Sequence, residues 1–442
     1  MGWLCFFAFA CQSYSPKTLD PQVTAGEFGK RSLEDPDLRS ALIASGHWKA
    51  RQSWPPAPWG LRPLQGAGLH YSPDIAVAKA QAQSALAAIG TADTTPNPSL
   101  AFAPELGTSG GVASPWVLGF SLNFPIETAG KRQLIVSQAR AQSNAAVLGI
   151  SEKAWAVISG VRSSLLDLEA GSKRLEILNS QRENDAEIVA IIGGKIQVGE
   201  SPRTDLGVYQ TQQSRNLVDL ADGRSKLETA RARLADAIGV PAISLRGLMV
   251  CFGPLDRFPE MPSTQTLRKA ALLQRTDLLG LLENYAAADA GLRLEIARQY
   301  PDLNLNPGYT FDQGQAKWAL GIGLSLPIDR NLGPIREAIA KREEAAAIFE
   351  RQQIKIRGEL DQSLAAYNAD RTRLRDIEKL LADQEFQLNA AEKLNQAGEA
   401  DRLGIFAARS LVLQTSLVRI DALLQAQQSL GKLADSAQQD LD

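Results

Sequence analysis

The strongest constraint on how this chain can fold is an internal duplication with a period of about 200 residues. Four short landmarks occur twice, in the same order and at nearly the same spacing. The pairs are Ser72-Pro73-Asp74-Ile75 with Arg275-Thr276-Asp277-Leu278, Pro98-Ser99-Leu100 with Pro301-Asp302-Leu303, Asn123-Phe124-Pro125-Ile126 with Ser325-Leu326-Pro327-Ile328, and Val198-Gly199-Glu200 with Ala397-Gly398-Glu399. Such a tandem repeat predicts that both units share one architecture.

The repeat divides a chain of 442 residues, which is too long for a single hydrophobic core. We place the first repeat at residues 72–262 and the second at residues 263–442. Residues 12–71 are rich in Pro, Gly, Ser and Trp and offer no clear amphipathic pattern. We expect them to form an extended N-terminal arm, either wrapped around a neighbouring subunit or disordered.

Each repeat contains a pair of strands with one apolar face. In the second repeat, apolar side chains alternate with polar or small ones from Leu303 to Phe311 and again from Trp318 to Leu326, around a polar loop at residues 313–317. Trp116 to Phe124 shows the same alternation in the first repeat. This period of two predicts strands. Their length is typical of transmembrane β-barrels, although a half-buried sheet in a soluble sandwich has the same alternation.

A long helical hairpin follows each pair of strands. The sequence predicts helices at Lys131 to Gln197 and about Arg203 to Ile238, then at Gly333 to Gln396 and about Arg402 to Gln439. A helix of 64 residues would be roughly 95 Å long. That length suits a structure that bridges a periplasm better than it suits a globular core. A plain coiled-coil protein could carry such helices, but it would not need the amphipathic strands.

The composition argues against catalysis, metal binding and nucleic-acid binding. The net charge is -2, so the chain has no basic surplus for nucleic acid. It has two histidines and three cysteines, and none of them shows the spacing of a zinc site or of a disulfide framework. No Ser, His and Asp set and no phosphate-binding glycine loop stands out. We therefore predict that the protein is not an enzyme and that it has no metal and no cofactor.

The first residues form a short apolar run, MGWLCFFAFAC, that lacks the basic residues of an ordinary secretory signal. We treat residues 1–11 as a candidate signal segment and Cys11 as a candidate site of lipidation. No later stretch has eighteen uninterrupted apolar residues. If this protein crosses a membrane, it should do so with strands.

These features together resemble the TolC-type outer-membrane efflux factor family and, within it, the heavy-metal (CzcC-like) branch. The resemblance covers roughly Tyr71 to Ala437. It rests on Thr95-Pro96-Asn97-Pro98, on the strand-to-helix passages at Phe124 to Arg132 and Leu326 to Gly333, and on the helix-tip pattern at Val198 to Leu206.

The resemblance implies a mainly α fold with β structure, built from tandem repeats. Each protomer of a homotrimer would give four transmembrane strands to one twelve-stranded barrel, above a coiled-coil α-helical barrel with a mixed α/β equatorial region. It also implies the outer membrane of a Gram-negative bacterium, with the helical tunnel in the periplasm. The implied partners are outer-membrane lipid, a periplasmic adaptor (membrane fusion protein) and an inner-membrane RND-type pump. The cargo would be small molecules or metal cations.

The resemblance further assigns roles at the turns of the helical hairpins. The matching positions for adaptor docking are Val198, Gly199, Glu200, Ser201, Ala397 and Gly398. The candidates for a charged pore constriction are Asp205, Glu399, Asp401 and Arg402. The second repeat departs from the family pattern, because Gly404 stands where Asp205 stands in the first. Ordinary turn residues and solvated helix starts would look the same.

An alternative reading is a periplasmic coiled-coil adaptor, or a structural protein without a pore. Adaptors usually carry one helical hairpin, whereas this chain has two, each preceded by a pair of amphipathic strands. The duplication therefore favours a passive export duct.

Overall fold

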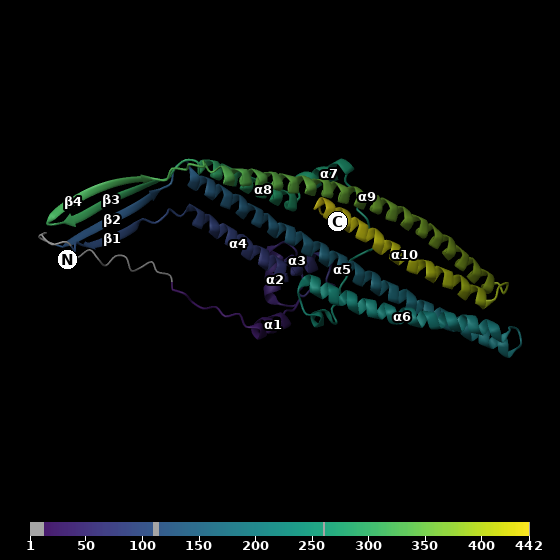
Figure 1. Ribbon diagram of the computed structural model, residues 1–442. Helices are drawn as coiled ribbons and strands as arrows, with labels where there is room; N and C mark the ends of the chain where they lie inside the picture. Colours follow the sequence, from purple (N-terminus) through teal and green to yellow (C-terminus); the bar gives the residue numbers. More distant parts are fainter. Residues whose placement is uncertain (1–12, 109–114, 260, 442) are drawn as a thin grey trace.

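The protein is elongated, with a sheet at one end and long helices that run away from it (Figure 1). The computed structural model describes residues 13–108, 115–259 and 261–441. The candidate signal segment and Cys11 lie outside the described residues. The turns of both helical hairpins lie together at the end farthest from the sheet.

Both repeats contain the same elements in the same order: two helices, two strands and two long helices. The first has α3 (Leu61–Tyr71), α4 (Pro73–Asp93), β1 (Ser99–Leu106), β2 (Trp116–Ile126), α5 (Lys131–Gln197) and α6 (Arg203–Ile238); the second has α7 (Thr264–Leu273), α8 (Thr276–Ala297), β3 (Leu303–Asp312), β4 (Gln315–Leu324), α9 (Leu332–Gln396) and α10 (Arg402–Ala437). Because α3 matches α7, the structural repeat begins before residue 72.

In the described part of the chain, the sheet has four antiparallel strands in the order β1-β2-β3-β4. The predicted loop at residues 313–317 is wrong, because β4 already begins at Gln315. The chain turns at Gln313 and Gly314, whose φ angles are 50° and 82°. Two consecutive residues with positive φ make the tight turn that matches the twist of a β-hairpin, so no longer loop is needed.

The helices α5 and α6 begin and end at the predicted residues, and α9 and α10 differ from the prediction by one and two residues. Within each hairpin the two helices pack antiparallel, and α10 also packs on α5. By length and composition alone, α10 is the one described helix that could cross a membrane. The most apolar window of this helix is 11% buried, and the helix packs on α9 and α5.

The expectation of an extended N-terminal arm at residues 12–71 is contradicted where this region forms helices. Besides α3, this region contains α1 (Pro21–Gly29) and α2 (Pro36–Ala44). Asp20 and Asp35 cap these two helices, and a proline occupies the first turn of each. Leucines and a tryptophan of the region are buried against α5 and α6, in one core with Val161, Leu165, Leu234 and Ile238. Burial of this apolar surface stabilises the packing of α2 and α3 on α5 and α6.

The second repeat has an equivalent core, in which α7 packs against α9 and α10. Figure 1 shows α2 and α3 beside the middle of α5, and α7 beside the middle of α9. The expected mixed α/β equatorial region is thus largely helical in the described residues. Its β structure there is one isolated parallel bridge between Trp59 and Val250.

Candidate functional site

The sheet has one continuous apolar face, because the strand register brings alternate residues of all four strands to the same side. Phe102 pairs with Phe120, Phe120 with Tyr309, and Tyr309 with Trp318. The rings of the first and last of these pairs are in contact, with centroids 4.7 and 4.9 Å apart. Large exposed side chains cover this face: Leu100, Phe102, Leu106, Trp116, Phe120, Leu122, Phe124, Ile126, Leu303, Phe311, Trp318, Leu320, Ile322 and Leu324. A soluble protein rarely leaves so large an apolar patch uncovered.

The opposite face of the sheet is small and polar. Its residues include Gly119 and Ser121 on β2, Asn304 and Asn306 on β3, and Gly321 on β4. Its ion pair between Lys317 and Asp312, at 2.8 Å, lies at the β3–β4 turn. The faces therefore differ in the way expected of a sheet with lipid on one side and water on the other.

Two strands of this sheet have an unpaired edge. In the described residues β1 and β4 each pair with one neighbour only, and they do not pair with each other. Unpaired backbone N–H and C=O groups at such an edge favour pairing with another strand.

A partly buried clasp, between Lys131 of the first repeat and Asp302 of the second, joins the two repeats where the sheet meets the long helices. Lys131, the first residue of α5, donates from Nζ to the Asp302 carboxylate at 2.8 Å and to the Tyr300 carbonyl at 2.6 Å. The Thr128 N–H donates to the same carboxylate at 2.9 Å. The clasp fixes the start of β3 to the start of α5, because the buried ammonium group would be costly without these partners.

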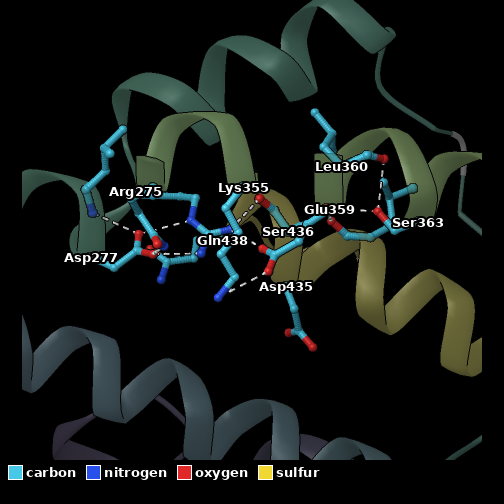
Figure 2. A network of polar contacts seen from close by, with 12 residues as sticks. Arg275, Asp277, Lys355, Glu359, Leu360, Ser363, Asp435, Ser436 and Gln438 are labelled. Carbon is cyan, nitrogen blue, oxygen red and sulfur yellow. Dashed lines mark hydrogen bonds and ion pairs between the residues drawn. The ribbon is translucent and has the colours of Figure 1, made fainter. Parts of the chain in front are cut away.

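A polar network fills the junction where the end of α10 meets the start of α8 (Figure 2). Arg275, buried at 8% exposure, donates to the Ser436 carbonyl at 2.8 Å and pairs with Asp277 through both of its carboxylate oxygens. Burial alone would raise the pKa of Asp277, but hydrogen bonds and the charge of Arg275 outweigh it and lower this pKa. A cavity of about 830 Å³ lies beside the junction and is also lined by Trp155 and Asp435.

The first repeat closes its equivalent junction, between α6 and α4, with a residue from the N-terminal region. Arg31 donates to the Tyr71 carbonyl at 3.0 Å and to the Gly239 carbonyl at 2.8 Å. The Tyr71 hydroxyl donates to the Ser32 carbonyl at 2.9 Å. Burial, reinforced by Asp35, raises the pKa of this hydroxyl to about 12, so it remains a donor at all ordinary pH values. In both junctions a guanidinium group thus donates hydrogen bonds to backbone carbonyls at a helix end.

The turns of the two helical hairpins have the same geometry. Gly199 and Gly398 have φ angles of 80° and 79°. The Glu200 N–H donates to the Lys195 carbonyl at 2.8 Å, and the Glu399 N–H donates to the Leu394 carbonyl at 2.9 Å. These bonds satisfy carbonyls at the helix ends, and the positive φ explains the glycine. The predicted docking residues Val198, Gly199, Glu200, Ser201, Ala397 and Gly398 all lie in these two turns.

One of the predicted constriction residues links the two hairpins. Asp401 caps α10 by accepting from the Leu403 N–H and forms an ion pair with Lys195 in the last turn of α5. The hydrogen bond from Lys195 lowers the pKa of Asp401, and the same bond raises the pKa of Lys195. Both shifts favour the charged form of the group concerned. We call this ion pair the tip latch.

The other predicted constriction residues are not brought into one cluster with Asp401. Arg402 lies 3.9 Å from Glu187 of α5, and Glu399 is exposed in its turn. Asp205 lies in the first turn of α6, and its carboxylate has no hydrogen bond or ion pair within the described ranges. Among the residues that the structure describes, no group of three His, Cys, Asp or Glu side chains could hold a metal ion.

The sequence reasoning missed Lys195 and a buried polar layer above the tips. Asn184 of α5 donates to the Phe406 carbonyl and to Ser410 of α10, at 3.0 and 2.8 Å. The next residue, Asp185, is also buried and accepts from Asn216 of α6 at 3.3 Å. Burial raises the pKa of Asp185. The sequence offered one signal for this layer: Asn184 and Asp185 are adjacent polar residues in a long helix that was expected to pack in a coiled coil.

Comparisons with known proteins agree with this architecture. Residues 67–240 and 267–437 match the model of the family described as "Outer membrane efflux protein". The chain is similar to the cobalt-zinc-cadmium resistance protein CzcC of Cupriavidus metallidurans, at 22% identity over 313 residues, which cover 70% of this chain and 74% of the relative.

Two solved structures show the same fold at low sequence identity. The outer membrane protein VceC of Vibrio cholerae matches with a TM-score of 0.70 and 18% identity, over 86% of this chain and 97% of that one. CusC, whose structures concern transmembrane channel formation, matches with a TM-score of 0.68 and 18% identity, over 85% and 91% of the two chains. The two segments matched by the family correspond to the two structural repeats.

Proposed function

The chain belongs to the outer membrane efflux protein family, and from this premise we propose that it is the outer-membrane channel of a tripartite efflux system. In this proposal three copies form a passive duct from the periplasm to the exterior of a Gram-negative bacterium. The sheet forms the wall of a membrane barrel, and the long helices form a tunnel below it.

The observation that carries the proposal is the amphipathic sheet with two unpaired edges. Its apolar face suits lipid, and its small polar face suits a water-filled lumen. A lone sheet of four strands leaves open edges, which hydrocarbon does not tolerate. Pairing of β4 with β1 of the next copy would close twelve strands into a barrel and satisfy every backbone group.

Exposed apolar side chains on the outer helices of the bundle support the same assembly. These side chains are Val208, Leu217 and Val218 on α6, and Ile354 and Phe386 on α9. These two helices flank α5 and α10, so they would meet between neighbouring copies of a trimer.

The position of the helix tips supports the proposed partners. In the proposed orientation the hairpin turns lie deepest in the periplasm, where Val198 to Ser201 and Ala397 to Gly398 would dock a periplasmic adaptor connected to an RND-type pump. Asp205, Glu399, Asp401 and Arg402 would then lie near the narrow end of the tunnel. Small molecules or metal cations are the proposed cargo, by analogy with the name of the CzcC relative.

The test is planar-bilayer conductance of the detergent-purified oligomer. We expect a trimer in detergent that forms discrete channels. The matched variants are Leu320→Arg and Ala319→Arg, neighbours on β4 with opposite faces. A cation on the lipid face costs about 2–4 kcal/mol at mid-membrane, so L320R should lose channel insertion, whereas A319R should keep it and change the conductance. A monomer that does not conduct, or equal effects of both variants, would contradict the proposal.

A further inference from the structure

The two β-hairpins of the sheet have the same register, so the strand pairing in one repeat can be used to predict the pairing of equivalent residues in the other. Leu100 pairs with Leu122, and their equivalents Leu303 and Leu324 pair with each other. Phe102 pairs with Phe120, and their equivalents Leu305 and Ile322 pair as well. The residue-by-residue correspondence between β1 and β3, and between β2 and β4, therefore predicts a known pairing correctly.

The same correspondence can be applied to the contact between β2 and β3, which has no counterpart inside one chain. Phe120 pairs with Tyr309, Phe124 with Leu305, and Ile126 with Leu303. We replace each β2 residue by its equivalent in β4 and each β3 residue by its equivalent in β1. The contact between β2 and β3 then becomes a contact between β4 and β1. The result is Ile322 with Leu106, Leu326 with Phe102, and Ile328 with Leu100.

The end of β4 differs from the end of β2, its equivalent in the first repeat. β2 continues to Ile126, because its last residues pair with the start of β3. β4 instead stops at Leu324, and the equivalent residues up to Ile328 are not in a strand. Ile328 is 93% exposed and Leu326 is 73% exposed, whereas Ile126 and Phe124 are 45% and 38% exposed.

We infer that β4 of one copy pairs antiparallel with β1 of the next in this one register, which aligns Ile322 with Leu106 and Ile328 with Leu100 and extends β4 beyond Leu324. The inference rests on the proposed trimeric duct and defines the contact between its copies, which we call the seam. The register also places apolar side chains opposite apolar ones on both strands. A shift by a single residue would turn one apolar face toward the lumen.

The seam differs from the contact within one chain in lacking the clasp. The residue equivalent to Asp302 is Ser99, and the first residue of α9, equivalent to Lys131, is Leu332. Leucine and serine cannot form the ion pair that joins the repeats within a chain. Backbone hydrogen bonds and apolar contacts therefore hold the seam at the junction between sheet and helices.

Cysteine cross-linking tests the register. In a Cys251→Ser background, Glu105→Cys with Gly323→Cys places two cysteines directly opposite each other on the lumen face of the seam. Their equivalents, Ser121 and Gly308, are paired within one chain. Opposed Cβ atoms lie about 4.5–5.5 Å apart and diagonal ones about 7–8 Å, so a disulfide favours the opposed pair.

With copper phenanthroline as oxidant, we expect E105C/G323C to shift from the monomer to three times its mass on a denaturing, non-reducing gel. A103C/G323C and G107C/G323C, each shifted by two residues, should cross-link far less. S121C/G308C should form its disulfide within one chain without a change in mass. Single-cysteine variants identify any contribution from Cys5 or Cys11.

The outcomes separate this inference from the proposed function. If the wild-type protein conducts as a trimer but a shifted pair cross-links best, the register is wrong and the duct stands. The register is equally wrong if S121C/G308C reacts and no seam pair does. If the wild-type protein is a non-conducting monomer, the proposed function itself fails.

Discussion

Gly239 is a residue whose identity is set by two local constraints at once. It ends α6 with a φ of 86°, and a Cβ atom there would lie 2.9 Å from the Tyr71 carbonyl oxygen. Gly239→Ala should therefore lower the free energy of unfolding by roughly 1–3 kcal/mol, because the backbone is strained and the Arg31 contact is displaced. Thermal or denaturant unfolding measures this loss. Gly149→Ala is the control, because this helical glycine has open space around it and should gain up to about 1 kcal/mol. Equal effects of both substitutions would contradict the argument.

Single residues also show why parts of the site escaped prediction. The Arg275 network needs Ser436 and Gln438, which lie more than 160 residues away in sequence. Nothing local in either segment indicates that contact. The tip latch is similar, because Lys195 and Asp401 each look like an ordinary charged residue at a helix end. Only the packing of one hairpin on the other brings them together.

At the scale of elements, local signals were sufficient for the four long helices and for three of the strands. Alternation predicted three strands, and turn glycines with Pro202 placed the ends of α5 and α6 correctly. The N-terminal helices were missed because α1 to α3 are short and interrupted by proline-rich segments. Their leucines are buried by α5 and α6, which lie far along the chain. Tertiary burial, and not local periodicity, decides the structure of such segments.

The tip latch leads to a prediction about how easily the two helical hairpins separate. Lys195→Gln removes the ion pair that joins the end of α5 to the start of α10, so the hairpins should separate more easily. In the proposed duct we expect the open probability in planar bilayers to rise by a few-fold or less, since exposed ion pairs are weak. Lys173→Gln is the control, because its partner Glu169 lies on the same helix.

The pH dependence of the latch follows from the two pKa shifts. The pKa of Asp401 is lowered from 3.8, so its contribution is present above that value and is lost as pH falls through the lowered pKa. The pKa of Lys195 is raised from 10.5, so its contribution is lost only as pH rises beyond that value. Between about pH 5 and 9 the effect of K195Q should therefore be constant. A strong change in this range would show that another group controls opening.

At the scale of the whole molecule, the duplication gives the proposed trimer two kinds of contact between repeats, one within each chain and one between neighbouring chains. The contact between repeats within a chain carries the Lys131–Asp302 clasp, and the proposed seam between chains does not. Each repeat has its own equatorial core and its own guanidinium at the junction of its helices. The protomer is thus held together by charge and burial, whereas the sheet end of the seam relies on backbone pairing and apolar contacts.

This difference predicts that the seam can be strengthened by copying the clasp into it. Ser99→Asp with Leu332→Lys should place a carboxylate and an ammonium group at the positions equivalent to Asp302 and Lys131. A charge-assisted hydrogen bond contributes about 1.5–3 kcal/mol when well shielded, and the exposure of Leu332 argues for the lower end of that range. We expect the temperature at which the trimer dissociates in detergent to rise by several degrees at low salt, and the gain to shrink as salt screens the pair. Ser99→Asp with Leu332→Glu is the matched control, because like charges at the same positions should lower this temperature. If both double variants shift it in the same direction, the seam does not have the geometry of the contact between the repeats.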